Sequence, residues 1–142
     1  MNKFVKKSIF FFIYVGLVVG LIYGIPRGMS YLLKTPYPMA SITSGSMWPS
    51  FKKGDLVFIK GISSKNEVAL GDVIVYENEL GFTIHRVVEL KEDTLVTRGD
   101  ANNISDVPIS YDKIVGKALV TKSGKVLRIP KLGLVSVFAQ KK

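Results

Sequence analysis

Cysteine is absent from the 142-residue chain, and histidine occurs only once, at position 85. Without cysteine the protein can form no disulfide, no thiolate nucleophile and no cysteine-ligated metal site. A single histidine also excludes a metal site built from several imidazole ligands. The sequence therefore predicts that no metal ion is bound, and that any nucleophile is something other than a thiol.

Acidic residues are also scarce: 11 Asp and Glu stand against 20 Lys and Arg, which gives a formal net charge of +9. No basic stripe is interleaved with aromatic residues and no nucleic-acid-binding motif is present, so nucleic acid is not expected as a partner. Positive charge beside an apolar segment is typical of a protein next to anionic lipid head groups. The lipid bilayer is therefore the expected partner.

The N-terminal region contains an uncharged apolar run from Ser8 to Pro26. At about 1.5 Å per helical residue, this run nearly spans a hydrocarbon core of about 30 Å, and the helix could extend further toward Lys34. Basic residues before the run outnumber those just after it; they are Lys3, Lys6 and Lys7. The positive-inside rule then places the N-terminus in the cytoplasm and the rest of the chain outside the cell membrane.

The alternative for this region is a cleavable signal peptide, which also has a charged start and an apolar middle. The run is long for such a peptide, however, and no clean A-x-A cleavage site follows it. We therefore expect residues 1–34 to form a cytoplasmic tip and a single-pass anchor. Residues 35–142 are expected to form an extracytoplasmic domain.

The pattern after Lys34 predicts strands and turns, since helical periodicity is weak and β-branched runs are frequent. Two β-branched runs, each opened by a Gly-Asp pair, are expected strands at 55–60 and 72–77. Segments 82–90 and 94–99 are expected to form a hairpin, and the later run 114–120 is a further expected strand. The fold class is therefore mainly β, with one N-terminal transmembrane helix. The apolar segment 129–138 is too short to span a membrane. It could be a strand, a short helix or a membrane-surface segment.

The single histidine lies within an expected strand. Strand alternation places Thr83, His85 and Val87 on one face and Ile84 and Arg86 on the other. A lone histidine in a strand is usually structural, but a rigid strand is also a suitable support for a catalytic base. A catalytic role then requires a nucleophile and an orienting acid elsewhere in the chain.

Hydroxyl groups are concentrated in residues 41–50, a Gly- and Pro-containing segment after a short expected strand. Such a segment is commonly an ordinary polar turn. Here Met47, Trp48 and Phe51 would give it an apolar lining, which suits an extended hydrophobic peptide near a membrane. A second turn-like segment contains two acids, Asp100 and Asp106. Together the chain has the hydroxyl, imidazole and carboxylate of a catalytic triad.

Five short motifs in this order resemble the successive conserved boxes of type I signal peptidases, peptidase family S26. They are residues 44–49, 54–57, 71–76, 85–87 and 99–102. The resemblance extends over residues 42–120 and includes the anchor. Usual bacterial members carry lysine where this chain has His85, so the chain is similar to the Ser-His subtype of endoplasmic-reticulum and archaeal enzymes. Ala101 departs from the family pattern, which usually has asparagine there.

The resemblance implies a role for each matching residue. Ser46 would be the nucleophile, and His85 would be the general base and then the acid for the leaving amine. The Ser46 backbone N–H and the Ser44 hydroxyl would form the oxyanion hole. Asp106 fits the triad acid by spacing, and Asp100 fits a supporting turn, with the reverse assignment as the alternative.

The resemblance also implies a small signal-peptidase-like β domain that removes signal peptides from secreted preproteins by cutting after small residues. Such an enzyme needs no cofactor, and the secretion translocon is a candidate partner beside the preproteins. Three alternatives stay open. The chain could be a peptidase dedicated to one secreted or pilin-like partner, a catalytically silent membrane-tethered peptide-binding module, or a relative of the self-cleaving SOS repressors. The last lacks support because an apolar span stands where those proteins carry a DNA-binding domain.

Overall fold

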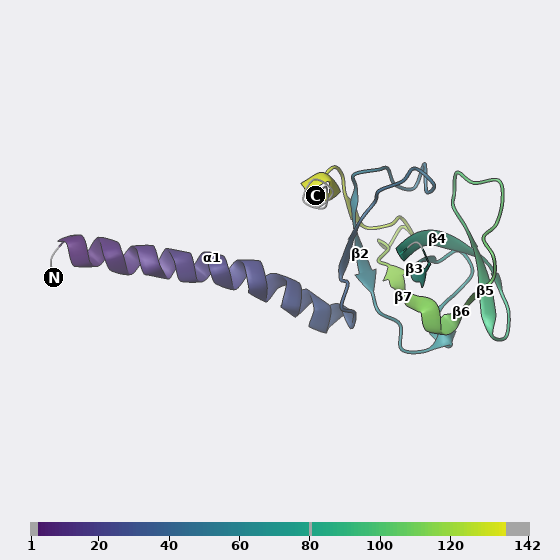
Figure 1. Ribbon diagram of the computed structural model, residues 1–142, viewed down its shortest axis with the longest axis horizontal. Helices are drawn as coiled ribbons and strands as arrows, with labels where there is room; N and C mark the ends of the chain where they lie inside the picture. The colour runs from purple at the N-terminus through teal and green to yellow at the C-terminus, as the bar shows by residue number, and fades with distance from the viewer. Residues whose placement is uncertain (1–2, 80, 136–142) are drawn as a thin grey trace. The chain divides into compact units, whose positions relative to one another are not determined.

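A computed structural model describes residues 3–79 and 81–135 of the chain (Figure 1). The chain divides into two compact units, Met1–Leu32 and Leu33–Lys142. The first unit is helical and the second contains all the described strands. The predicted fold class, one N-terminal helix followed by a mainly β domain, is confirmed.

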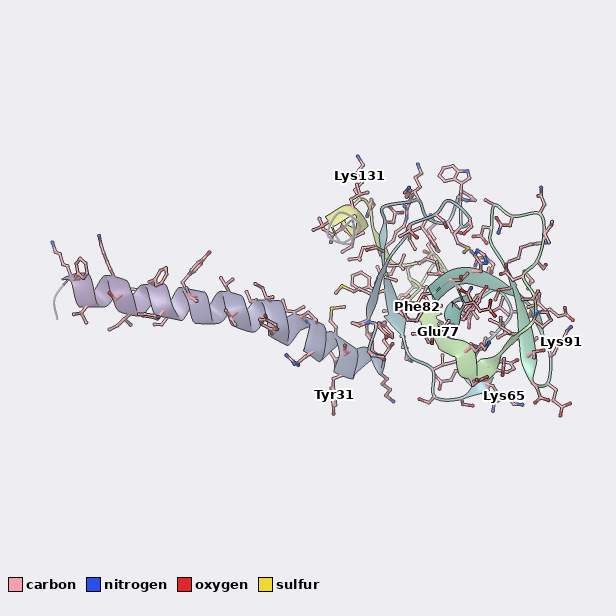
Figure 2. All side chains as sticks on the ribbon, viewed as in Figure 1. Tyr31, Lys65, Glu77, Phe82, Lys91 and Lys131 are labelled. Atoms are coloured by element: carbon pink, nitrogen blue, oxygen red, sulfur yellow. The ribbon has the colours of Figure 1, made fainter. Side chains whose placement is uncertain are left out.

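The N-terminal unit is a single helix, α1 (Lys3–Leu33), in which Pro26 lies within the helical span. Its most apolar 18-residue window has a mean hydropathy of 2.3, and none of its side chains is buried. Figure 2 shows these side chains projecting on all sides of the helix. At about 1.5 Å per residue the helix is longer than a hydrocarbon core of about 30 Å. The chain therefore has a single N-terminal membrane-spanning helix.

The second unit is an antiparallel sheet whose strands run in the order β1-β2-β7-β3-β4-β5-β6, with β8 also paired to β2. The strands are β1 (Met39–Ser41), β2 (Leu56–Lys60), β3 (Val73–Asn78), β4 (Gly81–Leu90), β5 (Thr94–Arg98), β6 (Ile109–Ser110), β7 (Ile114–Ala118) and β8 (Arg128–Ile129). Two short 3-10 helices, η1 (Lys65–Glu67) and η2 (Tyr111–Lys113), lie in the connections.

Each predicted strand corresponds to an observed one. The two Gly-Asp pairs form turns before β2 and β3, where Gly54 and Gly71 have φ values of 91° and 87°. These values lie in the left-handed region that glycine adopts without steric cost. The predicted hairpin is β4 and β5, which pair antiparallel with a register shift between Val87 and Glu89. The domain is therefore built from local turns that the sequence indicates directly.

Two hydrophobic clusters fill the domain. One contains Met47, Phe51 and residues of β2 and β3, and the other contains Tyr76, Val87 and Leu95. The alternation predicted for β4 is observed, since Ile84 packs against the first cluster while Val87 belongs to the second. The strand that carries His85 is thus held from both faces.

The C-terminal segment is tied to the turn before β2. Asp55, only 3% exposed, accepts hydrogen bonds from the Lys52 N–H at 2.9 Å and the Lys131 N–H at 3.4 Å, and it pairs with Arg128. Of the apolar segment 129–138, the structure places Ile129 at the end of β8, and residues 136–138 lie outside the described residues.

The carboxylate of Asp55 makes stability depend on pH. Burial raises its pKa, but the Lys52 N–H and Arg128 outweigh burial, so the net pKa is lowered. A lowered folded-state pKa stabilises the fold above the unfolded value of about 3.9, and this stabilisation is lost as pH falls through the folded value. We expect Asp55→Asn to cost about 1.5–3 kcal/mol at pH 7. The deficit should shrink below about pH 4.

Thermal unfolding followed by circular dichroism between pH 3 and 7 measures this effect. Asp93→Asn, at an exposed turn residue, is the matched control. A deficit for Asp55→Asn that stayed constant over the whole pH range would contradict the electrostatic explanation.

Candidate active site

Ser46 lies in the connection between β1 and β2, on a turn whose neighbours are fixed in the core. Met47 and Phe51 are 1% and 0% exposed, and the Phe51 N–H donates to the Met47 carbonyl at 3.2 Å. The prediction that Met47 and Phe51 line a peptide-binding surface is therefore wrong, because both side chains point into the first cluster. Trp48 alone of the three is exposed. The buried pair acts instead as an anchor that presents Ser46 from a fixed turn.

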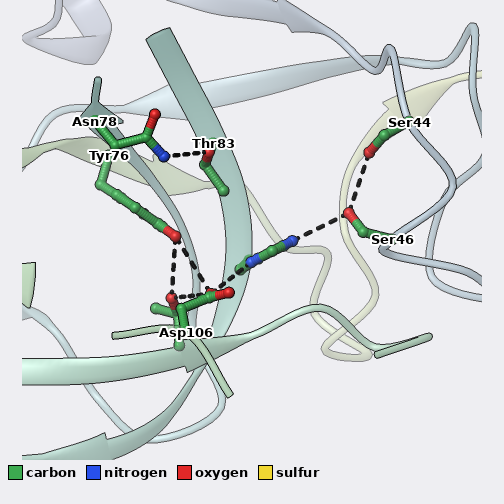
Figure 3. Close-up of polar contacts among 8 residues, drawn as sticks. Ser44, Ser46, Tyr76, Asn78, Thr83 and Asp106 are labelled. Atoms are coloured by element: carbon green, nitrogen blue, oxygen red, sulfur yellow. Dashed lines mark hydrogen bonds and ion pairs between the residues drawn. The ribbon is translucent and has the colours of Figure 1, made fainter. Parts of the chain in front are cut away.

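His85 presents its imidazole to Ser46. Its ring is almost fully buried, and Nε2 lies 3.1 Å from the Ser46 Oγ. The Ser44 Oγ lies 3.1 Å from the same hydroxyl. Figure 3 shows this line of contacts from Ser44 through Ser46 to the imidazole. A hydroxyl within hydrogen-bond distance of an imidazole nitrogen is the arrangement in which the imidazole can remove the hydroxyl proton.

Asp106 contacts the opposite nitrogen of the ring. Its Oδ2 lies 2.6 Å from His85 Nδ1, and it also accepts from Thr97 Oγ1 at 2.6 Å and from the Tyr76 hydroxyl at 3.2 Å. Burial, together with the nearby Asp106 carboxylate, raises the pKa of Tyr76. A carboxylate bonded to Nδ1–H fixes the tautomer in which Nε2 is free to accept a proton.

Asp100 does not contact the imidazole and forms a separate ion pair. Arg86 donates to both of its carboxylate oxygens, at 2.7 Å each, and Ser50 donates to it as well. Burial raises the pKa of Asp100, but the bonds from Arg86 and Ser50 outweigh it, and the net pKa is lowered. Arg86 also donates to the Gly71 carbonyl at 2.8 Å. This pair connects three segments around the site: the Ser46 turn, β4 and the loop after β5.

The loop after β5 contacts the Ser46 turn through its backbone. The Ala101 N–H donates to the Ser46 carbonyl at 2.8 Å. A Cβ at Gly99 would lie 2.6 Å from that same carbonyl oxygen, so only glycine fits there. Among residues 3–79 and 81–135, no hydrogen bond engages the Ser46 N–H. That N–H is thus available to a substrate oxygen.

A groove runs beside Ser46 and His85 between β1 and the start of β4. A pocket of about 130 Å³ lies there, and it shares lining residues with a larger, mainly apolar pocket of about 590 Å³. Tyr37 and Phe82 stack at its wall with ring centroids 4.9 Å apart. In the described part of the chain, β5 pairs with β4 only from Arg86 onward and β1 pairs only with β2. Over residues 81–85, β4 therefore has a strand edge beside the groove that no other described strand pairs with.

Known proteins similar to this chain are signal peptidase subunits. No protein-family model matches it. The signal peptidase complex catalytic subunit of Colletotrichum graminicola is 32% identical over 120 residues, which cover 78% of this chain and 69% of the relative. That of Eremothecium gossypii is 33% identical over 78% of this chain and 71% of the relative. That of Lachancea thermotolerans is 30% identical over 79% of this chain and 71% of the relative. The chain belongs to the type I signal peptidase family.

Membership of this family confirms the resemblance inferred from the five motifs and makes the chain a serine peptidase. Ala101 departs from the family pattern. The hydrogen bond from residue 101 to the Ser46 carbonyl uses the backbone N–H, so it does not require a particular side chain. The sequence did not reveal the roles of Thr97, Tyr76, Ser50 and Arg86 around the site. The hydroxyl of Thr97, directly after the apolar pair Leu95 and Val96, was a signal that could have indicated it.

Proposed function

We propose that this chain is a membrane-anchored serine endopeptidase that removes signal peptides from secreted preproteins. The observation that carries the proposal is the continuous contact from Ser46 through His85 to Asp106, with distances of 3.1 and 2.6 Å, in a member of the signal peptidase family. This contact favours an active peptidase over a catalytically silent peptide-binding module. A silent module gains nothing from a serine aligned with a carboxylate-oriented imidazole.

In the proposed mechanism Ser46 is the nucleophile. His85 Nε2 takes the Ser46 proton as the hydroxyl oxygen attacks the scissile carbonyl, and the imidazolium is stabilised by Asp106 at Nδ1. The developing oxyanion is bound by the Ser46 N–H and the Ser44 hydroxyl. His85 then gives its proton to the leaving amine as the C–N bond breaks. In the second half, His85 takes a proton from a water molecule that attacks the acyl-enzyme carbonyl, and it returns this proton to the Ser46 oxygen as the ester bond breaks. Asp100 holds the surrounding turns through Arg86.

The groove is the proposed binding site for the signal peptide. An extended segment can pair with the edge of β4 over residues 81–85 and lie along β1, where backbone hydrogen bonds supply affinity and pockets supply specificity. The pocket beside Ser46, about 130 Å³, is the smaller of the two and lies where the side chain next to the scissile bond would bind. The preference for small residues such as alanine is proposed from membership of the family.

The anchor sets the proposed location. The lysines before the membrane span place the N-terminus in the cytoplasm and the peptidase domain on the extracytoplasmic face of the cell membrane. The similar proteins are catalytic subunits of a signal peptidase complex, so partner subunits are expected beside the bilayer. The translocon is a further proposed partner, since preproteins emerge from it.

Cleavage of a preprotein by the full chain in detergent micelles tests the proposal. We expect a cut after the small residue, and replacement of that residue by phenylalanine should slow cleavage by at least about 100-fold, because the pocket rejects a larger side chain. Mass spectrometry of both products locates the cut. Absence of cleavage across a panel of preproteins would contradict the proposal, whereas cleavage of one panel member alone would indicate a peptidase dedicated to that partner.

A further inference from the structure

Asp106 lies on a connection without regular secondary structure, between β5 and β6. Its neighbours on this loop are exposed; Ile104 and Val107 are 81% and 78% exposed. Loops of this kind are the more mobile parts of a domain. Nevertheless, the Asp106 carboxylate is held 2.6 Å from His85 Nδ1. Something other than the loop itself must therefore fix its orientation.

Thr97 binds Asp106 at two points. The Thr97 carbonyl accepts from the Asp106 N–H at 2.8 Å, and the Thr97 hydroxyl donates to Asp106 Oδ2 at 2.6 Å. The hydroxyl has a single proton, and its other neighbour, the Tyr76 oxygen, is more distant at 3.4 Å. Thr97 is fully buried in β5, where valine would fill the same space without a polar group. Burying a hydroxyl is costly unless it is hydrogen-bonded, so its use here indicates a role at Asp106.

Tyr76 supplies a second donor from β3. Its side chain is buried and its hydroxyl donates to Asp106 Oδ2 at 3.2 Å. Because burial raises its pKa, the phenol stays protonated at neutral pH and keeps its proton for the carboxylate. Figure 3 shows the Tyr76 side chain reaching toward Asp106. Asp106 Oδ2 is therefore held by donors from β3, β4 and β5.

We propose that Thr97 and Tyr76 are positioning residues that hold the Asp106 carboxylate against His85. The inference rests on the proposed catalytic role of Ser46, His85 and Asp106. Neither residue contacts the hydroxyl of Ser46 in the described structure, so both act through Asp106 alone. Their loss should lower kcat, which depends on the imidazole, and leave the binding groove and KM unchanged.

The test uses isosteric substitutions in the full chain in detergent micelles, with preprotein cleavage as the readout. Thr97→Val and Tyr76→Phe should each lower kcat about 10-fold, the effect of losing one hydrogen bond to a charged group, while KM changes less than about 2-fold. Thr97→Ser keeps the hydroxyl and should retain most of the activity. Thr94→Val on the same strand and Tyr111→Phe, whose hydroxyl donates to the Lys91 carbonyl, are matched controls and should behave as wild type.

A double-mutant cycle with Asp106→Asn separates positioning from general stability. If both residues act through Asp106, then adding Thr97→Val or Tyr76→Phe to Asp106→Asn should change kcat by less than about 2-fold. If Thr97 and Tyr76 had only a structural role, their substitutions would lower activity equally in the wild type and in Asp106→Asn. That outcome would overturn the inference. Should Thr97→Val not fold, the Tyr76→Phe cycle alone decides.

The proposed triad and the proposed positioning role would be refuted by different results. Wild-type activity in Asp106→Asn would refute the triad, and the positioning role would fall with it. A strong loss in Asp106→Asn with full activity in both Thr97→Val and Tyr76→Phe would leave the triad intact and refute only the positioning role.

Discussion

Ser46→Ala is expected to reduce kcat for preprotein cleavage by about 10⁴–10⁶, since it removes the atom that we propose forms the acyl-enzyme. Among the residues that the structure describes, no second hydroxyl is hydrogen-bonded to the imidazole Nε2. Ser46 Oγ is 3.1 Å from His85 Nε2, whereas Ser44 contacts the Ser46 hydroxyl and not the ring. The substitution removes one oxygen atom from a turn anchored by buried neighbours, so the fold should persist.

Two other serine variants sharpen this comparison. Ser44→Ala should cost about 10²–10³ in kcat, the typical effect of losing one oxyanion-hole donor. Ser63→Ala, at an exposed position, is the matched control and should have no effect. Rates are measured under single-turnover conditions with circular dichroism to check folding. Activity of Ser46→Ala within about 10-fold of wild type would exclude Ser46 as the nucleophile.

His85→Ala should produce a loss of similar size, and the double variant Ser46→Ala/His85→Ala should be no worse than either single variant. Residues that act as one catalytic unit are strongly non-additive, because removal of either member already abolishes the shared step. The residual rate should match that of Ser46→Ala in the same assay. A double variant that lost activity as the product of two independent effects would indicate that the two residues act in separate steps.

His85→Lys should not restore activity, although usual bacterial members of the family have lysine at this position. A lysine base must be unprotonated, which requires desolvation without a nearby negative charge. Here the Asp106 carboxylate lies 2.6 Å from Nδ1 of His85. Next to this carboxylate, the ammonium group of a lysine at position 85 would be held in its charged form. We expect less than about 1% of wild-type kcat at pH 7–9. Activity above about 10% would show that the site accepts a Ser-Lys dyad.

Local patterns in the sequence were sufficient to predict much of the fold and part of the candidate site. The strand runs, the Gly-Asp turns and the β4–β5 hairpin all depend on neighbouring residues, and alternation along β4 placed Ile84 and Val87 on opposite faces. The resemblance to signal peptidases singled out Ser46, His85 and the two acids. Their catalytic roles stay predictions, although the structure brings Ser46, His85 and Asp106 into one line of contacts.

Side-chain contacts across an intervening strand could not be predicted. Tyr76 of β3 and Thr97 of β5 meet at Asp106 with β4 between them, and this meeting depends on the register of both strand pairs, which the sequence pattern does not set. The choice between Asp100 and Asp106 has the same origin, since it depends on which acid Arg86 engages from the neighbouring strand. The apolar side chains of the Ser46 turn were misassigned because hydrophobicity alone does not distinguish a core anchor from a groove lining.

The close approach of Gly99 to the Ser46 carbonyl has a consequence for inhibition. With no space for even one methyl group between them, the loop that carries Asp106 and the turn that carries Ser46 are in direct backbone contact. An inhibitor that displaces either segment must also break or shift this contact. A resistant variant could not escape by enlarging residue 99, since any side chain there would push Ser46 out of place.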